Sequence, residues 1–413
     1  MSATKLTLQH QKYYYTSEDF KWPRHWHCTE DGQHKQELSK FDKELQERWD
    51  AAVDAGCFAY KLHQVEGRVV PGKYRLFVQL NEMRFNKRRQ PEAISSISQP
   101  FNPEKFNFTK VHSREVLFEL CPKHTPAAAT SGDDCHLMMI NASPMEYGHS
   151  LLVPSVSSWL PQVLTEEALL LALETSMLSN HRVKNDIFSF LNFEFIQYMQ
   201  VLTEEALLLA LETSMLSNHR GFHVGFNSLC AHASVNHLHF HVWYSEYPSY
   251  LETAEVDVVC ENVFEVKNYP TTAFVFELAP ETNVGSLART IHKVASYLIE
   301  EEVAHNFHII RGARCRPTSQ MNGFTHEDSD LQSVLRVFLW PRNPVHGAKQ
   351  MSSYESERRP VAVYEFAGSL AIERRETFDS FTEDQFCEHM RSATLPENEF
   401  SRHRQAIRDL FNK

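Results

Sequence analysis

The sequence lacks the features that mark a membrane, secreted or nucleic-acid-binding protein. Its eight cysteines form no C-x-x-C pair, which argues against a disulfide scaffold and a zinc ribbon. Glycine provides only 13 of 413 residues, so the chain is not of low complexity. The most apolar helical stretch, residues 168–173, is too short to span a bilayer, and the first residues lack the apolar core of a secretory signal.

The chain also lacks a positive charge balance, since its formal net charge is −12. An acidic surface repels nucleic acid and anionic lipid, so we expect neither as a partner. We expect a cytoplasmic protein, and an anionic small substrate would need a local basic or dipolar pocket. The sequence leaves the oligomeric state open.

The order of expected elements indicates an α+β protein. Apolar residues make up 42% of the chain, which is enough for a large core. We divide the chain into a polar and helical segment (1–66), a catalytic half (67–255) and a carboxyl-terminal half (256–413). Apolar spacing predicts helices over 41–56, 284–304 and 382–413, and strands over 74–80, 116–120, 136–140, 151–153, 236–244, 255–266, 306–311, 331–342 and 361–367.

One segment of the chain occurs twice. Residues 162–182 and 200–220 are identical, letter for letter. Solenoid repeats diverge and need about three copies to bury a core, so this pair indicates a duplication. Removing residues 183–220 leaves one copy that runs directly into Gly221, a suitable helix stop. We therefore treat 183–220 as an insertion, expect one copy to dock and the other to be a surplus helix, and expect protease cleavage within 183–200.

The segment NHLHFHVWY at 236–244 alternates polar and apolar side chains. In a strand, His237, His239 and His241 would share one face, and the residues between them would share the other. Buried imidazoles need partners, which leaves three interpretations open: satisfied structural histidines, a zinc site, or a nucleophilic site. Against zinc, the three positions are spread along one strand and no carboxylate or cysteine lies beside them.

A neutral imidazole attacks phosphorus readily at pH 7, and its phosphoramidate product turns over. Such a site needs donors around the phosphate oxygens, and Ser234 and Asn227 precede the histidine segment. The residues therefore favour a nucleophilic site that attacks phosphorus, with Ser234, Asn227 and His241 as donors to the phosphate oxygens.

HLHFH resembles the HφHφH signature of the histidine-triad superfamily, whose middle histidine is the nucleophile. The superfamily has a serine five residues before it, as at Ser234, and an asparagine about thirteen before it, where this chain has Asn227 at twelve. Its upstream loop matches Asn141 and His149, with asparagine where relatives carry a ribose-binding aspartate. His232 is a departure, because many relatives have a small residue there.

Five ordered segments resemble the GDP-hexose phosphorylases of this superfamily: GKYRLFVQLNEMRFNKRRQ, QPFNPEKFNFTKV, NASPMEYGHSLLVP, GFNSLCAHASVNHLHFH and VLRVFLWPR. The resemblance covers about residues 60–160 and 221–370. It implies an antiparallel histidine-triad sheet with flanking helices, a catalytic first half and a degenerate second half without a triad of its own. His241, where plant members have glutamine, points to GDP-D-glucose as substrate.

The resemblance implies that His239 takes the guanylyl group and phosphate releases it as GDP, with no cofactor and no metal. His237 would orient the strand, and Asn141 and His149 would complete the nucleotide site. Further substrate-binding candidates are Arg84, Lys87, Arg88 and Arg336, together with Asn306 and Arg311 from the second half. The alternatives are a nucleotide-sugar hydrolase, a metalloenzyme, or an inactive guanine-nucleotide sensor if the insertion displaces the phosphate loop.

Overall fold

A large mixed sheet forms the centre of the molecule. The computed structural model describes residues 10–22, 37–62, 65–87, 89, 91–123, 136–156, 203–315, 333–348 and 360–412. The eleven strands follow the order β1-β5-β6-β7-β9-β8-β13-β14-β12-β11-β10. They are β1 (Lys12–Tyr15), β5 (Val116–Pro122), β6 (His136–Ile140), β7 (Tyr147–Val153), β8 (Phe222–Asn227), β9 (Phe240–Tyr244), β10 (Val256–Cys260), β11 (Val263–Val266), β12 (Phe274–Leu278), β13 (Ala304–Gly312) and β14 (Val334–Arg342). Only β1 and β5 pair in parallel within this sheet.

The same topology occurs twice in this sheet. Strands β5-β6-β7-β9-β8 form one half and β10-β11-β12-β14-β13 form the other. In each half a three-stranded meander leads to a helix, α5 (Glu204–Leu216) or α6 (Val284–Glu300), and then to two further strands. The halves meet where β8 pairs antiparallel with β13, with Asn227 opposite Asn306. The expected α+β class and the two-half plan are both present.

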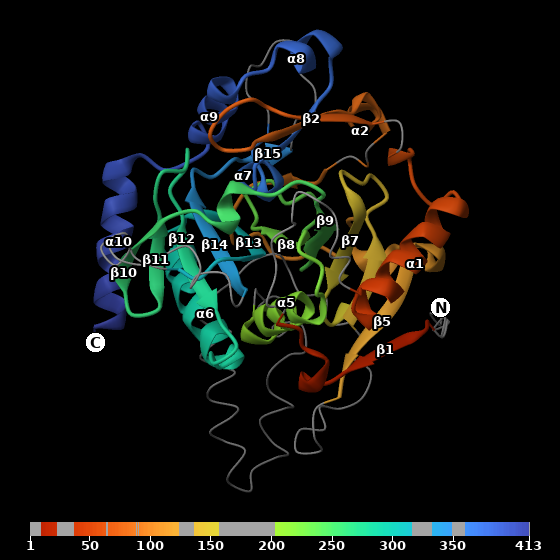
Figure 1. Ribbon diagram of the computed structural model, residues 1–413, viewed down its shortest axis with the longest axis horizontal. Helices are drawn as coiled ribbons and strands as arrows, with labels where there is room; N and C mark the ends of the chain where they lie inside the picture. Colours follow the sequence, from red (N-terminus) through yellow and green to blue (C-terminus); the bar gives the residue numbers. More distant parts are fainter. Residues whose placement is uncertain are drawn as a thin grey trace, which may run out of the picture.

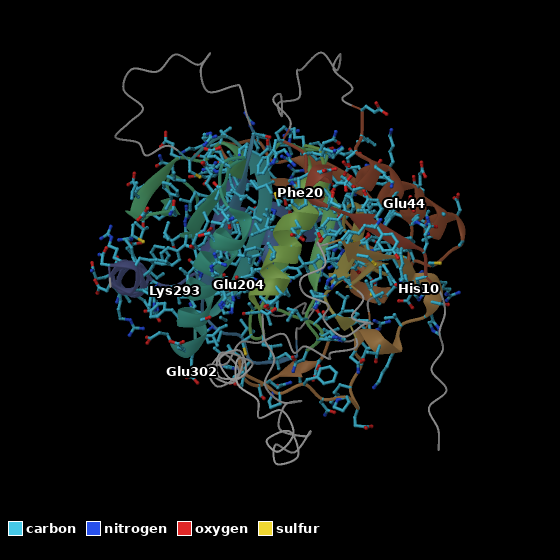
Figure 2. All side chains as sticks on the ribbon, turned by 90° about the horizontal axis from the view of Figure 1, so that it is seen from below. His10, Phe20, Glu44, Glu204, Lys293 and Glu302 are labelled. Carbon is cyan, nitrogen blue, oxygen red and sulfur yellow. The ribbon has the colours of Figure 1, made fainter. Side chains whose placement is uncertain are left out.

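Four helices cover one face of the sheet: α1 (Lys40–Asp54), α5, α6 and α10 (Glu397–Phe411) (Figure 1). Phe41, Leu45 and Trp49 are buried at the spacing of four that predicted α1. Polar contacts join neighbouring helices of this layer: Glu204 of α5 pairs with Arg289 of α6 at 3.2 Å, and Lys293 of α6 donates to the Leu410 carbonyl of α10 at 2.9 Å. Figure 2 labels Glu204 and Lys293 among the side chains of this layer. No helix within the described ranges is long and apolar enough to cross a membrane.

A smaller layer covers the opposite face of the sheet. It contains the three-stranded sheet β16-β3-β2, a short β4–β15 pair and four helices. The strands are β2 (Glu66–Val69), β3 (Phe77–Leu80), β4 (Ala93–Ile94), β15 (Gly347–Ala348) and β16 (Ser369–Ile372), and the helices are α2 (Glu82–Lys87), α7 (Val363–Phe366), α8 (Arg375–Ser380) and α9 (Glu383–Arg391). Helix α7 contacts β8 and β13, so this layer closes over the junction of the two halves.

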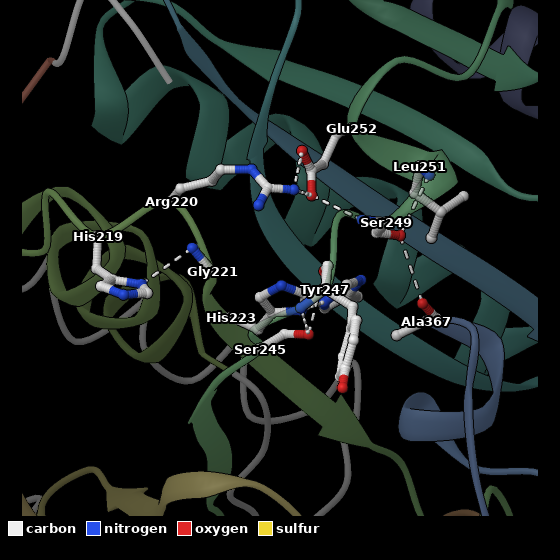
Figure 3. Close-up of polar contacts among 11 residues, drawn as sticks. His219, Arg220, Gly221, His223, Ser245, Tyr247, Ser249, Leu251, Glu252 and Ala367 are labelled. Atoms are coloured by element: carbon white, nitrogen blue, oxygen red, sulfur yellow. Dashed lines mark hydrogen bonds and ion pairs between the residues drawn. The ribbon is translucent and has the colours of Figure 1, made fainter. Parts of the chain in front are cut away.

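The second copy of the repeated sequence docks as α5. Its buried side chains include Leu207 and Leu211, and it packs against α6 and β8. At its end Arg220 makes two bonds to the Glu252 carboxylate, at 2.8 and 3.0 Å, as Figure 3 shows. The first copy, the insertion between the copies and the expected cleavage segment lie outside the described residues.

Gly221 has a different role from the expected helix stop. Helix α5 ends at Leu216, and Ser217 is already extended. Gly221 instead lies against β9, where a Cβ atom would come within 1.9 Å of the Ser245 carbonyl oxygen. The requirement for glycine at this position is therefore steric.

Two other expectations need correction. Residues 361–367 were expected to form a strand, but α7 occupies 363–366, because this apolar segment packs as a turn of helix over β8. The carboxyl-terminal helix expected over 382–413 is divided into α9 and α10, with Pro396 before the first turn of α10. The division of the chain at residues 66 and 255 stays a prediction.

Candidate active site

The histidine segment enters the sheet only at its third histidine. Strand β9 begins at Phe240, so His237 and His239 precede it, and the expected strand over 236–244 is shorter than predicted. The predicted two-faced pattern nevertheless holds. Leu238, Phe240 and Val242 lie in the core beneath the helices, and the histidines face the opposite side.

His239 is held in one tautomer by the backbone. Its Nδ1 lies 2.8 Å from the His237 carbonyl oxygen, which can only accept, so Nδ1 carries the proton. The Nε2 atom therefore carries the lone pair that a nucleophile needs. Burial lowers the pKa of His239 to about 4, while the bond to the His237 carbonyl opposes this shift. The ring is consequently neutral at pH 7.

His237 anchors the loop that precedes β5. Its Nδ1 accepts a hydrogen bond from the Phe108 backbone N–H at 3.0 Å. Burial, followed by the neighbouring His239, lowers its pKa to about 3. The Phe108 ring lies 5.0 Å from that of His239, centroid to centroid, and forms one wall of the nucleophile's surroundings. His237 thus positions both Phe108 and, through its carbonyl, His239.

A histidine relay determines the orientation of His241. His149 Nδ1 accepts from the Met145 N–H at 3.0 Å, which fixes the orientation of the His149 ring. His149 Nε2 lies 3.1 Å from His241 Nδ1 and 3.1 Å from the Asn141 carboxamide nitrogen. His241 therefore directs Nδ1 at His149, and its Nε2 lies on the other side of the ring. The structure brings His149 and Asn141 next to the triad, as predicted.

The loop between β8 and β9 carries Ser234 and is held at several points. Cys230 and His232 have left-handed backbone angles, with φ of 57° and 69°. The Ser234 carbonyl accepts from Glu92 N at 3.0 Å, and Asn236 Nδ2 donates to the Gln99 and Pro100 carbonyls. The loop therefore has a fixed, strained conformation over the histidines.

A cavity collects five of the predicted site residues, Arg84, His149, Asn227, Ser234 and His241, whereas His239, His237 and Asn141 are not part of its lining. The lining residues come from both halves: Arg84, Met145, His149, Asn227, His232, Ser234, His241, Trp243, Ala362, Val363, Tyr364 and Glu365. Arg84, which donates to the Ser143 carbonyl, supplies the positive charge that an anionic ligand requires. Helix α7 and the residue before it bring the carboxyl-terminal part of the chain into this lining.

Not all predicted residues reach the cavity. The buried Arg336 guanidinium donates to the Leu251 and Ala254 carbonyls at 2.8 and 2.6 Å, so it holds backbone remote from the triad. Arg311 similarly binds carbonyls at the end of α5, including Ser217 O at 2.7 Å. Lys87 is exposed at the end of α2, and Arg88 lies outside the described residues.

The sequence interpretation missed Tyr364, Glu365 and Trp243. The Tyr364 hydroxyl donates to Glu146, and the Glu365 carboxylate accepts from Ala362 N at 2.7 Å. Tyr364 and Glu365 are adjacent polar residues within the apolar segment 361–367, and this was the signal that could have identified them. The interpretation of the segment as a strand gave no reason to place them at the site. Within the described part of the chain, no group of three or more His, Cys, Asp or Glu residues is arranged to hold a metal ion.

Comparison with known families accounts for nearly the whole chain. The family described as "GDPGP1-like, N-terminal domain" matches residues 40–192 and 193–243, and "GDPGP1-like, C-terminal domain" matches residues 256–413. GDP-D-glucose phosphorylase 1 of Xenopus laevis is 31% identical over 88% of this chain and 86% of its own length. The Danio rerio protein of that name is 32% identical, over 89% and 90%. GDP-L-galactose phosphorylase 1 of Arabidopsis thaliana is 27% identical, over 85% and 70%.

Solved structures confirm the fold. Yeast Ap4A phosphorylase Apa2 in complex with Ap4A superimposes with a TM-score of 0.51 at 12% identity, covering 87% of this chain and 98% of that one. The expected α+β fold, with two halves of one topology around a large sheet, is thus confirmed. With both domains matched in order, the chain belongs to the GDPGP1-like family.

Proposed function

We propose that this chain is a GDP-D-glucose phosphorylase, which converts GDP-D-glucose and phosphate into glucose 1-phosphate and GDP. The observation that carries the proposal is the neutral, backbone-oriented His239, whose ring lies 5.2 Å from that of His241, centroid to centroid, while His241 lines a cavity with Ser234 and Asn227. Relatives named for this activity align over most of their length. The resemblance of the HLHFH segment, with His241 at its third histidine, also favours GDP-D-glucose as substrate.

In the first half-reaction, His239 Nε2 attacks the α-phosphorus of GDP-D-glucose. A nitrogen–phosphorus bond forms, and the bond from that phosphorus to the glucose 1-phosphate oxygen breaks. The leaving group is a stable anion and needs little help from a general acid. The product is a guanylyl-histidine on the enzyme, and one molecule of glucose 1-phosphate departs.

In the second half-reaction, an oxygen of inorganic phosphate attacks the same phosphorus. The nitrogen–phosphorus bond breaks, GDP forms and neutral His239 is restored. Because the two steps are chemically alike, one set of donors serves both. His241 Nε2–H, the Ser234 hydroxyl and the Asn227 amide nitrogen stabilise the charge on the α-phosphate oxygens. Asn141 contributes to ribose binding.

The leaving group and the incoming phosphate occupy the same part of the cavity. Arg84 is its cationic side chain, and Tyr364 and Glu365 provide groups that can bind sugar hydroxyls. Lys87 and Arg88 follow Arg84 in the sequence and belong with it to the basic segment 84–89. A cytoplasmic location is part of this proposal, since six cysteines in the described ranges are free thiols.

The test is incubation of the purified protein with GDP-D-glucose, with and without phosphate, while glucose 1-phosphate and GDP are quantified. We expect phosphate-dependent formation of both products. Formation of GMP without phosphate dependence would instead identify a hydrolase, and GDP binding without turnover would identify a sensor. Loss of activity after exhaustive chelation would indicate a metalloenzyme. For an inactive folded protein, a deletion of 183–220 separates a wrong substrate from a disturbed site.

A further inference from the structure

The orientation of the Asn227 side chain is fixed by partners that can hydrogen-bond in one sense only. The Val363 backbone N–H can only donate, and it lies 2.8 Å from Asn227 Oδ1. The Ala231 carbonyl can only accept, so the Asn306 atom 3.0 Å from it is the amide nitrogen. That nitrogen also donates to Asn227 Oδ1 at 2.6 Å. The oxygen of Asn227 is thereby committed to these two donors, and the nitrogen end is the one presented to the cavity.

A buried arginine supports this pair from behind. Arg342 Nη1 donates to Asn306 Oδ1 at 3.5 Å and to the Val361 carbonyl. Asn306, Arg342 and Asn227 are exposed by only 0%, 2% and 6% of their surface. Hydrogen bonds are stronger in such a low-dielectric interior, and a satisfied network there holds one geometry. Asn306 lies on β13 and Arg342 on β14, so both belong to the half without a triad.

We propose that Asn306, supported by Arg342, is a positioning residue for phosphate binding by the catalytic half. It turns the Asn227 amide nitrogen towards the α-phosphate, and its contact with the Ala231 carbonyl fixes which end of the Asn306 carboxamide faces Asn227. The degenerate half therefore completes the catalytic site from outside it. The identity of the bound phosphate rests on the proposed function, whereas the orientation of Asn227 does not.

The positioning role of Asn306 determines how far kcat should fall when its side chain is removed. Removing one preorganised donor to a developing oxyanion lowers kcat by about 10²- to 10³-fold. Misplacing that donor costs up to about 10²-fold, because the contact is weakened without being lost. Asn306→Ala should therefore lower kcat for glucose 1-phosphate release by about 10- to 100-fold, with a smaller change in KM.

The decisive experiment is a double-mutant cycle with Asn227→Ala, Asn306→Ala and the double variant. If Asn306 acts through Asn227, the double variant should be slower than Asn227→Ala by no more than about twofold. Independent losses that multiply in the double variant would overturn the proposal. Asn306→Asp provides a second test: it can still accept from Arg342 but cannot donate to Asn227 or Ala231, so it should be as slow as the alanine variant.

Two further measurements separate positioning from general loss of structure. With the two α-phosphorothioate diastereomers of GDP-D-glucose, the wild type should prefer one, and both single variants should reduce that preference alike. Thr271→Val is the matched control. It removes the partner of Trp340 Nε1, a buried bond of 3.1 Å in the same half, and should lower stability without changing the preference. An unchanged preference in Asn306→Ala would contradict the proposal.

The same double-mutant cycle can be measured on GDP binding, which does not depend on turnover. GDP affinity, measured by calorimetry, should fall in both single variants and fall no further in the double variant. If the wild type does not catalyse phosphorolysis, the proposed function fails, yet this cycle still decides whether Asn306 positions Asn227. Unchanged GDP affinity in Asn306→Ala, or additive losses, would contradict the positioning role.

Discussion

At the scale of single residues, the proposed role of His239 depends on a neutral ring whose proton lies on Nδ1. Its burial lowers its pKa, and the His237 carbonyl fixes the proton on Nδ1. Neither effect requires a carboxylate partner, in contrast to catalytic histidines that act as general bases beside an aspartate. This environment suits a nucleophile better than a proton shuttle.

The depressed pKa has a consequence for rate against pH. A free imidazole is half protonated near pH 6.5, but His239, with a pKa of about 4, stays neutral well below that value. We predict that single-turnover release of glucose 1-phosphate, measured without phosphate, loses less than about twofold between pH 7 and pH 5.5. A rate that halves near pH 6.5, in protein still folded by circular dichroism, would contradict the environment described for His239.

Residue types and spacing were enough to select part of the candidate site, whose roles stay a prediction. His239, His241, Ser234 and Asn227 follow from one alternating segment and the loop before it, because local sequence determines their order. Tyr364 could not be found in this way. It reaches the cavity through the packing of α7 over β8, a contact between segments far apart in the chain.

At the scale of elements, Asp42 connects α1 to the end of α5 and to β9. Its buried carboxylate accepts from Ser217 Oγ at 2.6 Å, Asn218 N at 2.9 Å and the Tyr244 hydroxyl at 2.8 Å. Asp42→Ala leaves several buried donors unsatisfied, so we expect a loss of about 3 kcal/mol in unfolding free energy. Urea denaturation measures it.

The matched control for Asp42 is the exposed Asp54 on the same helix. Asp54→Ala should change the unfolding free energy by less than about 0.5 kcal/mol. Equal losses in the two variants would show that the effect comes from the acidic charge of α1 and would refute the role given to the Asp42 hydrogen bonds.

The identical repeat predicts that one copy is dispensable. Deleting 183–220 removes the copy that forms α5 but leaves 162–182, which supplies the same residues to the same place in the chain. The remaining copy can then make every contact of α5, and its last residue, Arg182, can pair with Glu252 as Arg220 does in the full chain. We expect a melting temperature within about 2 °C of the full chain, since stability should change by less than about 0.5 kcal/mol. A fall of more than about 5 °C would show that the insertion supports the fold.

Elements with a regular apolar period were predictable, and those shaped by neighbours were not. The spacing of Phe41, Leu45 and Trp49 is that of a helix, and α1 follows. The segment 361–367 is nearly all apolar, as a buried strand would be, so its sequence does not distinguish a strand from a buried turn of helix. It packs as α7 above the junction between β8 and β13.

At the scale of the whole molecule, two copies of one topology have diverged in role. The first half holds the triad, and the second provides Asn306, Arg342 and the α7 segment. The sequence resemblance predicted a degenerate second half, because that half contains no histidine triad of its own. The antiparallel pairing of β8 with β13, which brings Asn306 to Asn227, required the three-dimensional structure.

Buried histidines across the sheet make the fold sensitive to acid. Burial lowers the pKa of His223 and His237 to about 3 and that of His239 and His305 to about 4. Between pH 6.5 and 4 the unfolded chain binds protons that the folded chain does not, so stability falls as pH falls. We predict a urea midpoint that decreases steadily from pH 6.5 to 4.5.

A substitution pair checks the origin of this acid sensitivity. The variant His305→Asn removes one buried group and should make the decrease shallower, whereas His346→Asn, at an exposed position, should not change it. Equal slopes in the wild type and both variants would locate the acid sensitivity elsewhere.

The most direct test of the central claim is to trap the intermediate. The protein is mixed with GDP-D-glucose in the absence of phosphate, quenched in alkali, which preserves phosphoramidates, and digested for peptide mass spectrometry. Our account predicts a guanylyl group on His239, release of glucose 1-phosphate in equal amount, and discharge as GDP when phosphate is added. His239→Asn should fold and bind GDP but carry no adduct. An adduct on another residue, or turnover by His239→Asn, would contradict the account.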